Sequence, residues 1–175
     1  MRLSTFLLTC TSMLATLPAI SGEIVDGTFV GKQNGEIRVP LAAGRWQATD
    51  MERSAPTAVV SLRLAMPIGG THPVCDVTSA PGMGASAEHA EVAELIAKGM
   101  RDKGMDLGPA ELRQYNGRQV IRYSTVLNSQ GGSAKGDAFI LRGARDYFFV
   151  TCSANAAIYE RVRDVFEDLV ETIRY

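Results

Sequence analysis

The sequence has little of what enzymes, metalloproteins and nucleic-acid-binding proteins usually need. It contains only two histidines and three cysteines in 175 residues, and its 18 basic and 19 acidic residues leave a net charge of −1. Without an excess of positive charge, the chain has no electrostatic attraction to nucleic acid or to an anionic membrane surface. It also lacks G-x-S-x-G, H-E-x-x-H and C-x-x-C motifs and a phosphate-binding glycine loop. We therefore expect no catalytic residue, no cofactor, no metal site and no nucleic-acid partner.

The first 21 residues have the pattern of a signal peptide. Arg2 precedes an apolar stretch at residues 6–15, and the small residues Ala19 and Ser21 occupy the positions that signal peptidase reads. We therefore expect cleavage directly after Ser21. The alternative is a retained membrane anchor, but a spanning helix needs about 20 apolar residues, and threonines, a serine and a proline interrupt this stretch.

Cleavage would leave residues 22–175 as a single globular domain of 154 residues (175 − 21). This length is typical of one domain with one sizeable core. We expect this mature chain to have no membrane span and to be periplasmic or secreted. The first of the three cysteines, Cys10, would be removed with the signal peptide.

The two remaining cysteines, Cys75 and Cys152, would face an oxidising compartment, which favours a disulfide between them. A reactive thiol would need a histidine partner, and neither His72 nor His89 lies in a recognisable catalytic motif. His72 stands three residues before Cys75, but a zinc site needs about four ligands, and no second close pair is present. Two packed free thiols remain the main alternative. We predict a structural Cys75–Cys152 disulfide.

Several segments have the two-residue period of β-strands. In residues 58–66, apolar residues alternate with smaller or polar ones, and Asn34-Gly35 is a strong hairpin signal between two further runs. Four short runs follow between residues 111 and 152. The last of them has bulky apolar residues in both alternating sets, which predicts a strand that is covered on both faces.

Two segments have the three- and four-residue spacing of amphipathic helices. The first begins after a capping residue, Ser86, carries glutamates early and basic residues late, and ends at Gly104. The second runs from about Asn155 almost to the last residue. The sequence thus predicts an α+β fold, in which an antiparallel sheet of about six strands has helices on both faces.

The order of these elements resembles that of the PsbP-like domains, which include the bacterial DcrB-like proteins. The resemblance spans residues 28–175. It rests on four segments, "GEIRVPLAAGRWQAT" with its Gly-x-Trp end, the middle helix to "KGM", the strands "GRQVIRYSTVL" and "GDAFILRGARDYFFVTCSA", and the closing helix "YERVRDVFEDLVETIRY". It implies a PsbP-like α/β/α sandwich and a non-enzymatic domain that binds or assembles with other proteins. It assigns no catalytic residue. The Cys75 and Cys152 pair departs from the family pattern.

Two functional hypotheses follow. The first is a non-catalytic interaction or assembly module with an unknown protein partner in the cell envelope. The second is a periplasmic carrier of a small apolar ligand, suggested by methionines at positions 66, 83, 100 and 105. Methionine side chains adapt to irregular pockets, although they more commonly fill cores. A cavity lined by these residues would favour the carrier, and an exposed interaction surface would favour the module.

Overall fold

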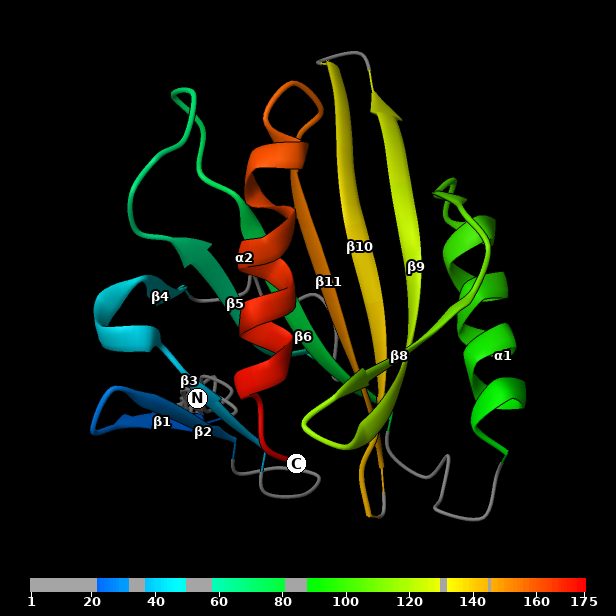
Figure 1. Ribbon diagram of the computed structural model, residues 1–175, viewed down its shortest axis with the longest axis horizontal. Coiled ribbons are helices and arrows are strands. Elements are labelled where there is room, and N and C mark those ends of the chain that lie inside the picture. The colour runs from blue at the N-terminus through cyan, green and yellow to red at the C-terminus, as the bar shows by residue number, and fades with distance from the viewer. Residues whose placement is uncertain (1–21, 32–36, 50–57, 81–87, 130–131, 145) are drawn as a thin grey trace, which may run out of the picture.

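A computed structural model of the protein describes residues 22–31, 37–49, 58–80, 88–129, 132–144 and 146–175 (Figure 1). The expected signal peptide and the Asn34-Gly35 turn lie outside these residues. Ser86 also lies outside them, and it is not the cap of the first helix, because that helix begins at His89 and its N-cap residue is Glu88. Within the described part of the chain, neither helix is long and apolar enough to cross a membrane.

The described elements comprise eleven strands, two α-helices and a short 3-10 helix. In chain order they are β1 (Gly22–Val25), β2 (Thr28–Gly31), β3 (Arg38–Pro40), η1 (Ala42–Gly44), β4 (Trp46–Thr49), β5 (Ala58–Leu64), β6 (Val74–Ala80), α1 (His89–Asp102), β7 (Asp106–Leu107), β8 (Glu111–Tyr115), β9 (Arg118–Ser129), β10 (Gly132–Arg142), β11 (Tyr147–Asn155) and α2 (Tyr159–Thr172).

Two antiparallel sheets organise the fold. The small sheet has the order β1-β2-β3, and the main sheet has eight strands in the order β4-β5-β6-β11-β10-β9-β7, with β8 also paired to β9. The longest strands, β9, β10 and β11, form its centre (Figure 1). Since β6 pairs with β11, strands that are far apart in the sequence become neighbours in the sheet.

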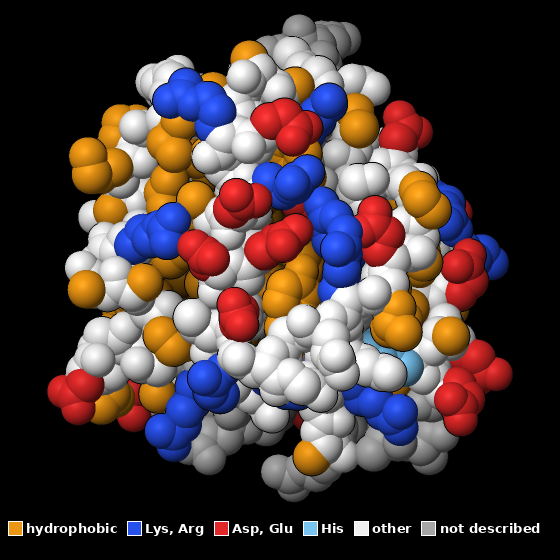
Figure 2. Space-filling view, viewed as in Figure 1, with side chains coloured by type: hydrophobic (Ala, Val, Ile, Leu, Met, Phe, Trp, Pro, Cys, Tyr) orange, Lys and Arg blue, Asp and Glu red, His pale blue; other side chains and the backbone are white. Residues whose placement is uncertain are grey.

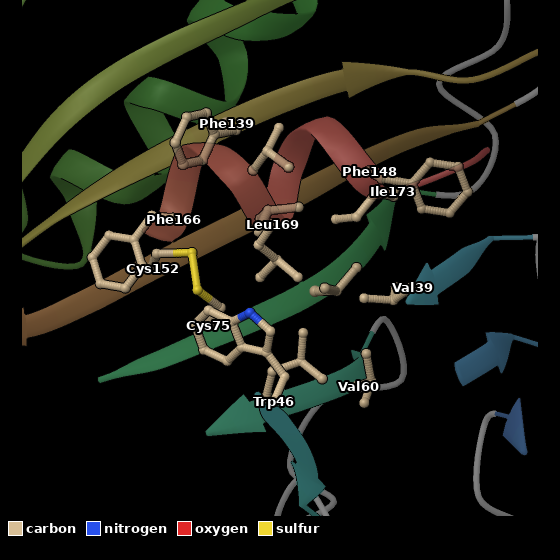
Figure 3. Close-up of a cluster of buried hydrophobic side chains, with 14 of the residues drawn as sticks. Val39, Trp46, Val60, Cys75, Phe139, Phe148, Cys152, Phe166, Leu169 and Ile173 are labelled. Atoms are coloured by element: carbon tan, nitrogen blue, oxygen red, sulfur yellow. A yellow bond between two sulfur atoms is a disulfide. The ribbon is translucent and has the colours of Figure 1, made fainter. Parts of the chain in front are cut away.

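The helix α2 packs against the larger of two buried clusters. Val162, Phe166 and Leu169 of α2 are buried there together with Phe139 of β10 and residues of β4, β5, β6 and β11. Figure 3 shows Trp46, Phe166, Leu169 and the disulfide within this cluster. Trp46, the single tryptophan of the chain, is only 2% exposed.

The helix α1 contributes to a second, smaller cluster. Val92, Ala93 and Ala97 are buried there together with Ala138 and Ile140 of β10 and residues of β9 and β11. Alternate residues of β10 therefore contribute to the two clusters. In β11, Phe148 and Val150 belong to the first cluster and Tyr147 to the second, so this strand has buried residues in both alternating sets, as its sequence predicts.

The α+β class and the antiparallel sheet agree with the sequence prediction, but the expected number of about six strands is too low. The strands β4, β6 and β7 of the main sheet are not predicted as separate strands by the sequence pattern. Nor do the helices form two equivalent layers. In β4 to β6, the alternate residues that do not join the α2 cluster are exposed or half-buried, as in Gln47, Ser61, Arg63 and Asp76. The helix α1 does not cover them, because it lies near β7 and β9.

Candidate functional site

A pocket of about 470 Å³ lies beside the C-terminal end of α2. It is formed by residues 40–46, by Asn116 in the turn between β8 and β9, and by residues 168–174. Its apolar lining consists of Pro40, Ala42, Trp46 and Leu169, and its polar lining consists of Arg45, Asn116, Asp168, Glu171, Thr172 and Arg174. The fold thus brings three distant segments to one surface depression.

The backbone that leads to Trp46 is held in an uncommon conformation. Ala42, Ala43 and Gly44 have φ values of 48°, 52° and 88°, and the left-handed region costs an alanine on the order of 1 kcal/mol. Two hydrogen bonds close the loop, from Arg45 N to Ala42 O (3.0 Å) and from Trp46 N to Leu41 O (3.1 Å). Backbone strain of this kind is often found at functional sites, so the loop marks the pocket as a candidate.

The opposite wall is the end of α2, where the last backbone carbonyls lack partners within the helix. Side chains from elsewhere supply donors to them. Asn116 Nδ2 donates to Glu171 O (2.9 Å), Arg118 Nη2 donates to Ile173 O (2.8 Å), and Arg174 Nη1 donates to Glu171 O (3.1 Å). The β8–β9 turn is thereby attached to the helix end, which gives the pocket a fixed shape.

The rim of the pocket carries charges of both signs. Arg45 Nη1 lies 3.3 Å from Asp168 Oδ2, and these side chains are 44% and 61% exposed. An ion pair this exposed contributes little to stability, so both groups can exchange their contact for one with a ligand. The pocket therefore offers an apolar wall and exchangeable hydrogen-bonding groups, which suit a peptide segment better than a purely apolar molecule.

A cluster of polar side chains is buried beneath the start of α2, away from the pocket lining. Asp137 of β10 is fully buried, and Arg122 of β9 is 6% exposed. Arg122 Nη2 lies 2.7 Å from Asp137 Oδ1, while the hydroxyl of Tyr159 donates to Asp137 Oδ2 at 2.9 Å. Arg122 Nη1 also reaches Glu111 of β8 at 3.1 Å. These contacts connect three adjacent strands with the first residue of α2.

Burial shifts the pKa values of the titratable groups in this cluster. Removal from water raises the pKa of the Asp137 carboxyl, while the Arg122 guanidinium and the Tyr159 hydroxyl act in the opposite direction. Burial also raises the pKa of Tyr159 to about 12, and the nearby Asp137 adds to this effect. Asp137, Arg122 and Tyr159 are each at most 6% exposed and satisfy one another's polar groups, which indicates a structural role.

The two cysteines are brought together. Cys75 and Cys152 stand directly opposite each other on β6 and β11, and their sulfur atoms are bonded at 2.04 Å. Both residues have no exposed surface. Because no thiolate or small reductant can reach buried sulfur atoms readily, this bond is not a candidate for catalytic exchange.

Neither histidine is paired with a serine or cysteine side chain in the contacts of the described residues. His72 Nδ1 contacts Leu64 O at 2.8 Å, and its Nε2 contacts a guanidinium nitrogen of Arg63 at 2.9 Å. The ring of His89 packs 5.6 Å from that of Tyr147, and burial lowers its pKa. Among the described residues, no group of three or more potential metal ligands gathers.

The described methionines do not gather in one place. Met66 is 77% exposed in the β5–β6 connection, whereas Met100 packs against the α1 cluster. Met105 lies beside Met100, since its backbone N donates to Met100 O at 3.2 Å. Met83 lies outside the described residues. The pocket beside α2 contains no methionine.

The sequence predicts the Cys75–Cys152 disulfide, but it does not predict the pocket. The only local signal is "LAAGRW", where a glycine follows two alanines and precedes an arginine and a tryptophan. A glycine there suggests a turn. Nothing in the sequence shows that this turn meets the end of a helix more than 120 residues later, as the 123-residue separation of Arg45 and Asp168 requires.

No protein-family model and no curated protein sequence matches the chain. Its fold is PsbP-like, since solved structures resemble it. Cyanobacterial PsbP (CyanoP) from Synechocystis sp. PCC 6803 is 14% identical, with a TM-score of 0.57 over 79% of this chain and 85% of CyanoP. LpqN, involved in cell envelope biogenesis of Mycobacterium tuberculosis, is 14% identical, with a TM-score of 0.56 over 78% and 81%. PA94 from Pseudomonas aeruginosa, a protein of unknown function described as a putative regulator, is 8% identical, with a TM-score of 0.53 over 74% and 96%.

Proposed function

We propose that the protein is an exported, non-catalytic module of the cell envelope that binds a protein partner at the pocket beside α2. The observation that carries this proposal is the pocket itself. Its accessible apolar lining is Pro40 and Ala42, above the buried Trp46 and Leu169, and the exposed Arg45–Asp168 pair supplies polar groups at the rim. Arginine side chains are enriched among the residues that dominate protein interfaces.

The surface around α2 supports a protein partner rather than a polyanion. Figure 2 shows acidic and basic side chains interspersed over the face that carries α2, without a large area of one sign. Such a surface can match a partner by local charge pairs, which favour specific association. It does not provide the continuous positive field that nucleic acid would require.

The location in the envelope is supported by two observations. The sequence begins with a segment that has the pattern of a signal peptide, and the structure contains a disulfide, which is typical of oxidising compartments. One structural neighbour, LpqN, is involved in cell envelope biogenesis. We also infer, from the alternation along β10, that α1 and α2 cover opposite faces of the main sheet, as in a PsbP-like sandwich.

Site-specific photo-crosslinking in the native host tests this function. A photoreactive amino acid would replace Asp168, which is exposed at the pocket rim, or Lys98, an exposed residue of α1, as the matched control. We expect a discrete protein adduct from position 168 and none from position 98. A second arm adds Arg45→Ala to the Asp168 probe and should weaken the adduct. No adduct at position 168, or equal adducts at both positions, would contradict the proposal.

The alternative of a small apolar ligand carrier has less support. The pocket is lined by six polar and four apolar residues, and none of them is a methionine. Native mass spectrometry of the purified protein would test the carrier function directly. A retained small molecule that survives purification would favour it over the interaction module.

A further inference from the structure

The strand β8 (Glu111–Tyr115) forms an open edge of the main sheet. Among the described strands, it pairs only with β9. Three successive side chains, Leu112, Arg113 and Gln114, are exposed, and Leu112 is 65% exposed. The strand β8 and the short strand β7 both pair with β9, along the edge of β9 that is not paired with β10. Open edges of this kind can pair with another chain.

The turn after β8 determines which backbone groups face outward. Asn116 and Gly117 have φ values of 49° and 75°, which identify a two-residue type I′ turn. In such a hairpin the residues that flank the turn, here Tyr115 and Arg118, form a hydrogen-bonded pair, and hydrogen-bonded pairs recur at every second residue. The N–H and C=O groups of Arg113 therefore face β9, and those of Leu112 and Gln114 face away from it.

These outward groups have no backbone partner among the described residues. Residues 108–110 lie between β7 and β8, outside both strands. Three residues there face only two residues of β9, so the regular alternation of β8 does not extend to them. A strand could thus add along β8 at residues 112 and 114.

The side chains of β8 are complementary to a second copy of themselves. In antiparallel pairing around a two-fold axis at Leu112, Glu111 lies opposite Arg113 of the second copy, and Arg113 lies opposite its Glu111. Both side chains are partly exposed, at 39% and 48%, and already contact each other within one strand. The axis also places the two exposed Leu112 side chains against each other. Opposite charges at facing positions stabilise a sheet, and like charges destabilise it.

We infer that β8 is a homodimerisation edge, through which two copies of the protein join their main sheets into one continuous antiparallel sheet. The interface consists of reciprocal backbone hydrogen bonds centred on the two Leu112 residues, two Glu111–Arg113 pairs and the Leu112–Leu112 side-chain contact. Such an interface is isologous, because both copies contribute the same strand edge, and isologous interfaces are typical of two-fold symmetric dimers. This inference does not rest on the pocket beside α2, because no residue of β8 lines that pocket, although Asn116 of the adjoining turn does.

Sedimentation velocity on the mature protein tests the dimer over about 1 μM to 1 mM, the range in which a weak interface associates. We expect a shift from monomer to dimer with rising concentration. Leu112→Pro removes an outward N–H group and leaves the β8–β9 hydrogen bonds intact, because proline is tolerated on edge strands. This variant should stay monomeric at every concentration while its melting temperature stays close to that of the unsubstituted protein.

A charge exchange identifies the register. Arg113→Glu places two glutamates opposite each other in the dimer, and Glu111→Arg places two arginines opposite each other, so each variant alone should be monomeric. An equimolar mixture restores opposite charges at both positions and should form a heterodimer. A monomeric unsubstituted protein at 1 mM, or dimerisation of Leu112→Pro and Arg113→Glu as strong as that of the unsubstituted protein, would overturn the inference. Melting curves confirm that each variant is folded.

Discussion

At the scale of single residues, Asp137 shows how a charged group is kept inside the sheet. Its carboxylate has no exposed surface and depends on Arg122 and Tyr159 for its hydrogen bonds. Desolvation of two buried charges offsets much of their mutual attraction, so the intact pair stabilises the fold only weakly. Loss of one partner is costly, because the other charge then stays buried without compensation.

We therefore expect Asp137→Asn and Arg122→Met each to lower the free energy of unfolding by about 3–5 kcal/mol. The double variant should lose clearly less than the sum of the two, because it leaves no unpaired buried charge. Urea unfolding of the four proteins of this double-mutant cycle provides the measurement. Additive losses would show that the two side chains do not act as a pair.

Two glycines make a matched pair of opposite predictions. A Cβ atom on Gly136 of β10 would come closer than van der Waals contact to the carbonyl oxygen of Cys152, whereas one on Gly99 of α1 would meet no atom within 4 Å. Gly136→Ala should therefore destabilise the protein by about 1–3 kcal/mol. Gly99→Ala should stabilise it by about 0.5–1 kcal/mol, because glycine is unfavourable within a helix. Thermal melting with equal or reversed shifts would refute these packing assignments.

At the scale of elements, the disulfide connects β6 to β11 and stabilises the pairing of strands that are separated by 77 residues. Closing a loop of this length is worth about 4.5 kcal/mol in the chain-entropy model. Cys75→Ser and Cys152→Ser should each lower stability by a similar amount, up to this value. The double variant should lose little more, because all three remove the same bond.

Melting curves of the three variants, together with a thiol assay on the native protein, test this bond. We expect no free thiol before denaturation and reduction. A Cys152 thiol that is alkylated readily in the native protein would contradict the disulfide and make a reactive thiol the better interpretation.

The elements differ in how far their sequences predict them. The second helix has a strong apolar period, and β11 has apolar residues in both alternating sets, so both were predictable. The strand β6 was missed because its outward residues, including Asp76 and Thr78, are only half-buried and its apolar pattern is weak. The pocket was not predictable, because it depends on positive φ values at Ala42 and Ala43, which alanine rarely adopts.

At the scale of the whole molecule, export is the prediction that most constrains the biology. The pattern of the first 21 residues predicts a mature protein that begins near Gly22 and lacks Cys10. Intact-mass spectrometry of the protein recovered from its native host measures this directly, and cell fractionation provides the compartment. The full-length mass in the membrane fraction would contradict both cleavage and the periplasmic or secreted location.

The disulfide also determines how the molecule would respond to mechanical tension. Force applied at the two ends of the domain passes from β6 to β11 through the Cys75–Cys152 bond, so the 77-residue loop between them carries no load. Reduction would release this loop, which at about 3.5 Å per residue adds roughly 270 Å of contour length. Single-molecule stretching before and after reduction should show this difference, and equal lengths would contradict it. While the bond is intact, α1 and strands β7 to β10 therefore lie within a segment that is mechanically shielded.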